Sequence, residues 1–219
     1  MSTVLTDIET RILGSLVEKQ VTTPEYYPLT LNALTLACNQ KNNRNPVTSY
    51  SDDQVAQALE TLREKNLAYV FYGSTSRVPK YKHVLPEVMH LNHPEVAVLC
   101  VLMLRGPQTP GELRGNASRL HEFRGLEEVE ETLSSLTTRD EPLVVRLPRQ
   151  PGQKEVRFAQ LLSGEIDIES MASEIEHSAP TPRRSSNEHL ERLEQKVEAL
   201  TAEIESLRQQ FEQFRKQFE

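Results

Sequence analysis

Apolar residues recur every three or four positions from residue 8 to residue 17, and the pattern returns at a shift of 86 residues. Thr6, with Glu9 three residues later, predicts a capping box at the start of this first helix. The shift maps Glu9 onto Glu95, and it maps the helix-start signal Thr23-Pro24 onto Thr109-Pro110. A later apolar stretch repeats at a shift of 74, in which Val55, Leu59 and Leu62 align with Val129, Leu133 and Leu136. The shorter second shift predicts an insertion in the first copy, which we place at the polar residues 39–50.

Each copy ends in a signature of a β-hairpin. Residues 67–72 are β-branched and aromatic, Gly73-Ser74 follows as a turn, and residues 77–83 return. In the second copy, residues 143–147 lead to the turn dipeptide Pro151-Gly152, and residues 156–162 return. The order helix, helix, helix, hairpin predicts a mainly α fold with small β-hairpins. We expect two tandem winged-helix domains, at residues 1–85 and 86–162.

The C-terminal part predicts a linker followed by a coiled-coil helix. Residues 163–187 are rich in Ser, Pro and acidic residues, as is typical of a flexible linker. Residues 188–219 keep heptad spacing, with β-branched residues at two central a positions, which favours a parallel dimer. The alternative is an amphipathic helix that folds back on its own domains, and the bulky Phe residues leave the number of strands open. The predicted dimerisation residues are Leu190, Leu193, Val197, Leu200, Ile204, Leu207, Phe211, Phe214 and Phe218.

The net charge of −7 is unevenly distributed along the chain. Residues 1–85 carry nine Lys and Arg against eight Asp and Glu, and residues 86–162 carry nine against eleven. Residues 163–219 carry seven against thirteen. Because the acidity belongs mainly to the C-terminal part, the overall charge does not argue against binding of nucleic acid by the first two segments.

Several classes of protein are disfavoured. The longest apolar run, residues 96–104, is too short to span a bilayer and predicts a buried helix. The N-terminus has no signal-peptide pattern, and Cys38 and Cys100 lie in apolar patterns, so we expect a cytoplasmic protein with two reduced core cysteines. His83, His90 and His93 match no zinc spacing, and no phosphate-loop or hydrolase motif is present. We therefore expect no metal, no cofactor and no enzymatic activity.

Two stretches carry a resemblance to a known family. They are EKQVTTPEYYPLTLNALTLACNQKNNRNPV, residues 18–47, and VLMLRGPQTPGELR, residues 101–114. With the acidic third helix that precedes PLVVRL at residues 142–147, the chain resembles the YceH-like family of uncharacterised bacterial proteins over about residues 5–162. The resemblance implies a tandem winged-helix fold and no established activity.

Basic and amide residues of the inserted loop and of both hairpins are the candidates for contacts with duplex DNA. No acidic residue lies between Ala68 and His83, and Glu155 is the one acid of the second hairpin. The alternative is that these cations are ordinary solvated residues. The candidates are Lys41, Asn42, Asn43, Arg44, Arg77, Lys80, Lys82, Arg146, Arg149, Lys154 and Arg157.

The third helix of each copy argues against contact with a DNA groove. The first of these helices contains Asp52, Asp53, Glu60 and Glu64, and the second has four carboxylates within residues 127–131. In the first copy Arg63 and Lys65 stand against these acids. Phosphates would repel the helix of the second copy, since like charges at close range are costly, so we expect that the second unit does not read DNA through its third helix. We expect a non-enzymatic, regulatory DNA-binding dimer with the first domain dominant. The alternative is a protein-interaction module that presents the acidic face of residues 127–131 to a basic partner.

Overall fold

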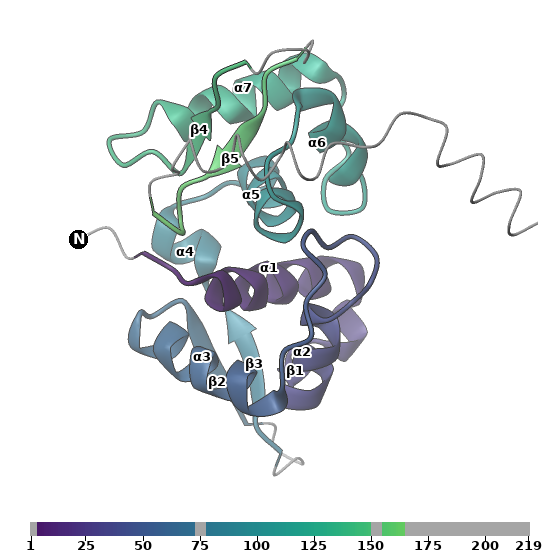
Figure 1. Ribbon diagram of the computed structural model, residues 1–219, viewed down its shortest axis with the longest axis vertical. Helices are drawn as coiled ribbons and strands as arrows, with labels where there is room; N and C mark the ends of the chain where they lie inside the picture. The colour runs from purple at the N-terminus through teal and green to yellow at the C-terminus, as the bar shows by residue number, and fades with distance from the viewer. Residues whose placement is uncertain (1–3, 73–77, 150–154, 165–219) are drawn as a thin grey trace, which may run out of the picture. The chain divides into compact units, whose positions relative to one another are not determined.

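The computed structural model describes residues 4–72, 78–149 and 155–164. They form a mixed α+β fold that is rich in helices and has two small antiparallel sheets (Figure 1). The helices are α1 (Asp7–Thr22), the 3-10 turn η1 (Pro24–Tyr26), α2 (Leu31–Cys38), α3 (Asp52–Glu64), α4 (Leu85–Met89), α5 (His93–Arg105), α6 (Pro110–Asn116) and α7 (Leu126–Thr137). The strands are β1 (Leu29–Thr30), β2 (Ala68–Phe71), β3 (Lys80–His83), β4 (Val144–Arg146) and β5 (Phe158–Gln160).

Each half of the described chain places three helices before an antiparallel hairpin. In the first half the hairpin β2–β3 gains β1, so the sheet order is β1-β3-β2. In the second half β4 pairs with β5, and Gln108 forms an isolated bridge with Phe158 just before α6, as β1 pairs with β3 just before α2. The helices and small hairpins predicted for residues 1–162 are therefore present in the described part of the chain, and α4, η1 and β1 are additions that the sequence pattern did not indicate.

A buried glutamate ties the start of α1 to α3 in the first half. The Glu9 carboxylate accepts from the backbone N–H of Thr6 at 2.7 Å, which completes the predicted capping box of α1. It also accepts from the Thr61 hydroxyl of α3 at 2.6 Å and from the Lys65 ammonium at 2.8 Å. The start of α1 is thus fixed to the last turn of α3.

The second half repeats this network at equivalent positions. The Glu95 carboxylate accepts from the Asn92 backbone N–H at 2.8 Å and from the Ser135 hydroxyl at 2.7 Å. The Arg139 guanidinium lies 4.0 Å from it. Glu95 lies 86 residues after its counterpart, and Ser135 and Arg139 lie 74 residues after theirs, so the hydrogen bonds support the internal repeat read from the two sequence shifts.

The placement of the insertion needs a correction. Thr30 is the N-cap of α2, as Thr109 is the N-cap of α6, and each side chain accepts from the backbone N–H three residues later. Thr23-Pro24, which the sequence aligned with Thr109-Pro110, starts only the 3-10 turn η1. The extra residues of the first copy are therefore divided between the segment before β1 and the loop between α2 and α3.

The repeated first helices, α1 and α5, pack against each other within one hydrophobic core (Figure 1). Residues 96–104 of α5 are all buried, which confirms the buried helix predicted from this apolar run. Gly14 and Cys100 are 86 residues apart, and the Cys100 thiol donates to the Gly14 carbonyl at 3.4 Å. The described residues belong to one compact unit, and its division into two domains at residue 85 stays a prediction.

Replacing Gly14 with Val is expected to lower the free energy of unfolding by about 1–3 kcal/mol. A Cβ atom at residue 14 would lie 3.0 Å from Leu104 Cγ and 3.1 Å from Met103 Cβ, so α1 and α5 would have to move apart. Gly115→Val is the matched control, because a Cβ atom there meets nothing within 4 Å. Urea unfolding followed by circular dichroism measures both variants, and equal losses of stability in the two would contradict the close packing of α1 on α5.

Candidate nucleic-acid interface

The outer face of the β1-β3-β2 sheet combines lysines with aromatic side chains. The register pairs Tyr69 with Lys82 and Phe71 with Lys80. Because successive side chains of a strand point to opposite faces, these four share one face. Tyr69 is 46% exposed and Phe71 is 43% exposed, and Lys82 is exposed as well. Large aromatic side chains at this level of exposure form an apolar patch beside two cations.

The opposite face of the same sheet fixes the hairpin to the core. Tyr81 and His83 of β3 are buried, and the Tyr27 hydroxyl accepts from the backbone N–H of His83 at 2.8 Å. Burial raises the pKa of Tyr27 and lowers the pKa of His83 to about 4. Both side chains are therefore neutral in the folded protein at pH 7. The buried inner face of β3 is thus fixed to the core, and its outer face carries the two lysines.

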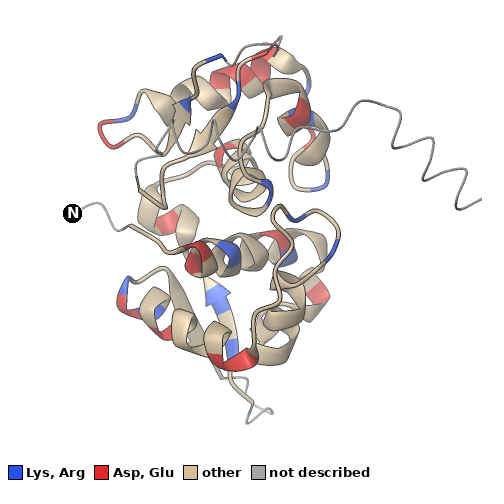
Figure 2. Ribbon diagram, in the orientation of Figure 1, with Lys and Arg blue, Asp and Glu red and all other residues tan. Residues whose placement is uncertain are grey.

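The two lysines of β3 carry charge that no described carboxylate neutralises. Within the part of the chain that the structure describes, Lys80 and Lys82 make no ion pair. Figure 2 shows the blue of basic residues on β3, and no acidic residue lies between residues 68 and 83. Arg77, the third predicted cation of this hairpin, lies outside the described residues. The face therefore presents an uncompensated positive charge.

The prediction that Arg44 contacts DNA does not fit the structure. Its side chain is fully buried and forms an ion pair with Glu18, with Nη2 2.7 Å from Oε2. The guanidinium also donates to the carbonyls of Ala37 and Asn43. Burial raises the pKa of Glu18, but the hydrogen bonds and charge of Arg44, with a smaller contribution from Lys19, offset this and leave the pKa below its usual value. Arg44 therefore holds the 39–50 loop onto α1 and α2.

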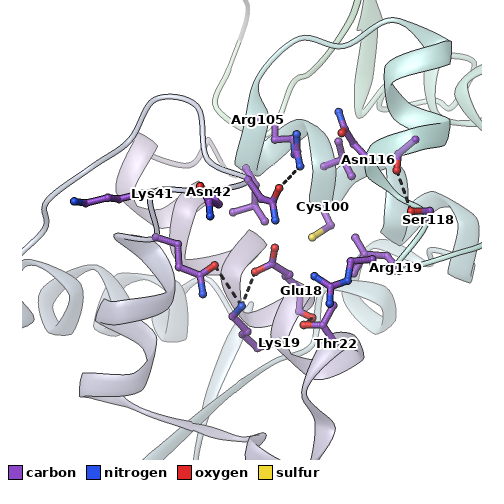
Figure 3. A pocket seen from close by; sticks show the side chains of 16 residues that line it. Glu18, Lys19, Thr22, Lys41, Asn42, Cys100, Arg105, Asn116, Ser118 and Arg119 are labelled. Carbon is purple, nitrogen blue, oxygen red and sulfur yellow. Dashed lines mark hydrogen bonds and ion pairs between the residues drawn. The ribbon is translucent and has the colours of Figure 1, made fainter. Parts of the chain in front are cut away.

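The other predicted residues of this loop are exposed. Lys41, Asn42 and Asn43 line a hollow of about 470 Å³ that also has walls from α1, α5 and residues 115–120 (Figure 3). Figure 3 shows the Lys41 side chain pointing away from the hollow. The loop itself is braced by Asn39, whose side chain bonds the backbone N–H and carbonyl of Tyr50, both at 2.8 Å. Asn39 thus joins the two ends of the loop, and the backbone N–H of Asn45 donates to the Leu104 carbonyl of α5 at 2.9 Å.

The second hairpin offers fewer cations than the sequence indicated. Arg157 is held by a bidentate ion pair with Glu112, at 2.7 and 3.0 Å, and it donates to the Pro107 carbonyl at 2.9 Å. This ion pair links the hairpin to the start of α6, and the contact of Arg157 with DNA stays a prediction. Arg146 and Arg149 are exposed, and Lys154 lies outside the described residues.

Neither sheet face nor core assembles a metal site from the described residues. No three His, Cys, Asp or Glu side chains among them lie close enough to hold an ion. Cys38 and Cys100 are both buried and free, as predicted, and burial raises the pKa of Cys38 to about 11. His93 and His121 face each other in an exposed contact, with their Nδ1 atoms 3.3 Å apart.

The sequence did not indicate the aromatic half of the β2–β3 face, or Arg105 and Arg119 at the hollow. The sequence shows two aromatic residues at alternate positions of one strand, Tyr69 and Phe71, and two lysines at alternate positions of the next, Lys80 and Lys82. Only the register of the hairpin shows that the two pairs lie opposite each other. The nine predicted dimerisation residues and the linker from residue 165 onward lie outside the described residues. Among the helices that the structure does describe, none combines the length and apolar character needed to cross a bilayer.

A family model and the sequences of known relatives place this chain in the same family. A family model described as a protein of unknown function, DUF480, matches residues 5–153. A UPF0502 protein of Opitutus terrae is 51% identical over 195 residues, covering 89% of this chain and 82% of the relative. Another, from Citrifermentans bemidjiense, is 52% identical over 197 residues, covering 90% of both chains. A UPF0502 protein of Koribacter versatilis is 52% identical over 179 residues, covering 81% of this chain and 83% of the relative. The chain therefore belongs to the DUF480 family of UPF0502 proteins, and this confirms the uncharacterised, YceH-like bacterial family that its motifs resemble.

Proposed function

We propose that the protein binds DNA without catalysis, through the outer face of the β1-β3-β2 sheet. In this proposal each half of residues 1–162 is a winged-helix unit, with β2–β3 as the first wing. The observation that carries it is the pairing of half-buried Lys80 and exposed Lys82 with the exposed rings of Phe71 and Tyr69 on a hairpin free of carboxylates. The order of three helices and a hairpin, with β1 added to the sheet, fits this type of unit.

The chemistry of this face suits a polyanion with exposed sugars and bases. A lysine without a carboxylate partner can contact a phosphate without first losing an ion pair, and each such contact releases a counterion from the DNA. Aromatic side chains add apolar contact with sugars or bases, which is insensitive to salt. Lys80 and Lys82 would supply the first kind of contact, and Tyr69 and Phe71 the second.

Helix α3 is a poor candidate for the main contact. Asp52 and Asp53 are exposed at its first turn, where the positive end of the helix dipole stabilises their charge. Glu60 forms an ion pair with Arg63, so the one arginine of α3 is not free either. We therefore assign the DNA contact to the hairpin and not to the third helix.

Dimerisation through residues 188–219 belongs to the same proposal. Two copies of the β2–β3 face on one dimer would double the number of phosphate contacts and favour a site with two halves. The parallel coil predicted from Leu190, Leu193 and the following heptads would supply that dimer.

Removing both lysines of β3 is expected to weaken DNA binding and to reduce its dependence on salt. Because the variant cannot bind the two phosphates that these lysines neutralise, the slope of log affinity against log salt should fall by about 2. The measurement is fluorescence anisotropy of the full-length protein with a labelled duplex of about 30 base pairs, titrated at about 50 mM and 200 mM salt. The variant is Lys80→Gln with Lys82→Gln.

The matched control removes two charges elsewhere, with Arg114→Gln and Arg124→Gln, which are exposed and belong to neither the proposed DNA contact nor the hollow beside the 39–50 loop. Its slope should change by clearly less than that of the first variant. Equal changes in the two variants would show that the contact is not on the β2–β3 face. No binding of the unmodified protein at about 50 mM salt would remove the proposal altogether.

A second candidate function is binding of a basic protein partner by α7. Glu127, Glu130 and Glu131 are exposed and make no ion pair with any residue that the structure describes. Glu128 differs from them, because it bonds His121 and the backbone of Arg124, which lowers its pKa to about 2. Charge reversal of the three free carboxylates would abolish such an interaction and leave DNA binding intact.

A further inference from the structure

The hollow beside the 39–50 loop collects cations from three separate parts of the chain. Lys19 comes from α1, Arg105 from the last residue of α5, and Arg119 from the segment after α6. Figure 3 shows Arg105 and Lys19 on opposite sides of the hollow, with Arg119 extending toward it. Its volume of about 470 Å³ lies within the range of about 300–1,000 Å³ that is usual for small-molecule sites.

The positive charge in this hollow is not balanced by carboxylates. Glu18 is the one acidic residue of its lining, and its carboxylate is already paired with Arg44, a buried residue that is not part of the lining. Lys19 contacts Glu18 at 3.0 Å and the Gln40 side chain, whereas Arg105 donates to the neutral side chain of Asn43. Arg119 makes no hydrogen bond or ion pair with any described residue. The lining therefore holds more positive charge than its own acid can neutralise.

The remaining walls supply polar groups and an apolar floor. Asn42 and Asn116 also line the hollow, and the Asn116 side-chain amide donates to the Gln108 side chain at 2.8 Å. Cys100 and Leu104 of α5 are buried beneath it. A guanidinium binds two oxygens of a phosphate in a planar, bidentate geometry, and a partly desolvated hollow strengthens that contact. A ligand of this class would also replace the hydration of Arg119 without breaking a protein contact.

We propose that this hollow binds a small molecule that carries a phosphate group, with Arg119 and Arg105 as its phosphate contacts and Lys19 as a further cation. Asn42 provides hydrogen bonds to the rest of the ligand. Because the walls come from both repeats, an occupied hollow holds the 39–50 loop, α5 and the segment after α6 together. The ligand therefore stabilises the arrangement of the two halves.

The test measures phosphate binding directly and needs no DNA. Full-length protein is titrated by isothermal calorimetry with inorganic phosphate and, separately, with ADP. Arg119→Gln is the test variant, because removal of this side chain breaks no described contact and leaves the fold intact. Arg114→Gln is the control, since it removes an exposed arginine five residues away that is not part of the lining.

We expect at least one probe to bind, with affinity reduced about tenfold or more by Arg119→Gln and less than twofold by Arg114→Gln. Absence of binding by both probes at about 10 mM overturns the proposal, as does an equal effect of the two variants. A third arm uses the labelled duplex: if Arg119→Gln weakens only duplex binding, the hollow is part of the DNA interface and the small-molecule site is excluded. Failure of the DNA proposal leaves the calorimetric result unaffected.

Discussion

Replacing Arg44 with Met is expected to lower the free energy of unfolding by about 3–5 kcal/mol, the cost of leaving one partner of a buried ion pair uncompensated. The Arg44 side chain has no exposure, and its guanidinium contacts both oxygens of Glu18, at 3.1 and 2.7 Å. It also satisfies the Ala37 carbonyl through two hydrogen bonds. Methionine fills much of the same volume but leaves the carboxylate and the carbonyl without these donors, and Lys19 compensates only part of the loss.

A double-mutant cycle separates the ion pair from simple packing. Arg44→Met combined with Glu18→Leu removes both charges, so the double variant should be more stable than Arg44→Met alone. Urea unfolding at pH 7 measures all three variants. An additive result, in which Glu18→Leu costs as much in the variant as in the unmodified protein, would show that the two side chains do not interact. DNA affinity of folded Arg44→Met should be unchanged, because the guanidinium does not reach the surface.

Arg44 illustrates why polar loops are read poorly from sequence. The stretch of residues 39–50 contains cations and amides of the kind that contact phosphates, and exposure is the usual state of such residues. Nothing local distinguishes Arg44 from Lys41, yet one is buried and the other is exposed. The difference comes from Glu18, which lies 26 residues earlier on α1, and the pairing appears only when α1 and α2 pack together.

The repeat was predictable for the opposite reason. Capping boxes and apolar spacing are local, so the shifts of 86 and 74 residues located the corresponding helices before any contact was known. Glu9 and Glu95 then occupy equivalent networks in the two halves. What the shifts could not locate was the division of the insertion, because Thr23-Pro24 and Thr30 both carry helix-start signals and only the structure shows which one caps α2.

The candidate sites depend on register and on long-range packing. Lys80 and Lys82 were identified from the sequence, whereas their pairing with Phe71 and Tyr69 depends on the length of the hairpin turn. The hollow is even harder to predict from the sequence, because Lys19, Arg105 and Arg119 are spread over a hundred residues of the chain. Packing of α1 against α5 brings these segments to one place, and the packing is a property of the core and not of the cations.

Stability should fall between pH 6.5 and pH 4 because of one buried histidine in the hairpin that carries the candidate interface. His83 is 5% exposed, its Nδ1 accepts from the Leu85 backbone N–H at 3.3 Å, and its Nε2 has no partner among the described residues. Burial lowers the pKa of His83 to about 4, which the nearby charge of Glu87 only partly opposes. In the unfolded chain the pKa is about 6.5. The neutral ring is therefore favoured by folding.

The sign of the effect follows from which state binds the proton more readily. Above pH 6.5 His83 is neutral in both states, and its contribution to stability is fully present. As the pH falls from 6.5 to 4, the unfolded chain gains a proton that the folded protein does not, so about 3 kcal/mol of stability is lost. Below pH 4 both states are protonated at this residue, and the loss levels off.

His83→Gln isolates this contribution from the carboxylates that also titrate in acid. Glutamine accepts from the Leu85 backbone N–H and carries no proton that titrates in this range. Urea unfolding of both proteins at pH 7, 6, 5 and 4 should show the unmodified protein losing about 3 kcal/mol more than the variant over that interval. Parallel curves would mean that His83 is accessible to solvent in the folded protein. Because the backbone of His83 is bonded to Tyr27 on the inner face of the sheet, this loss of stability would arise in the same strand that carries Lys80 and Lys82.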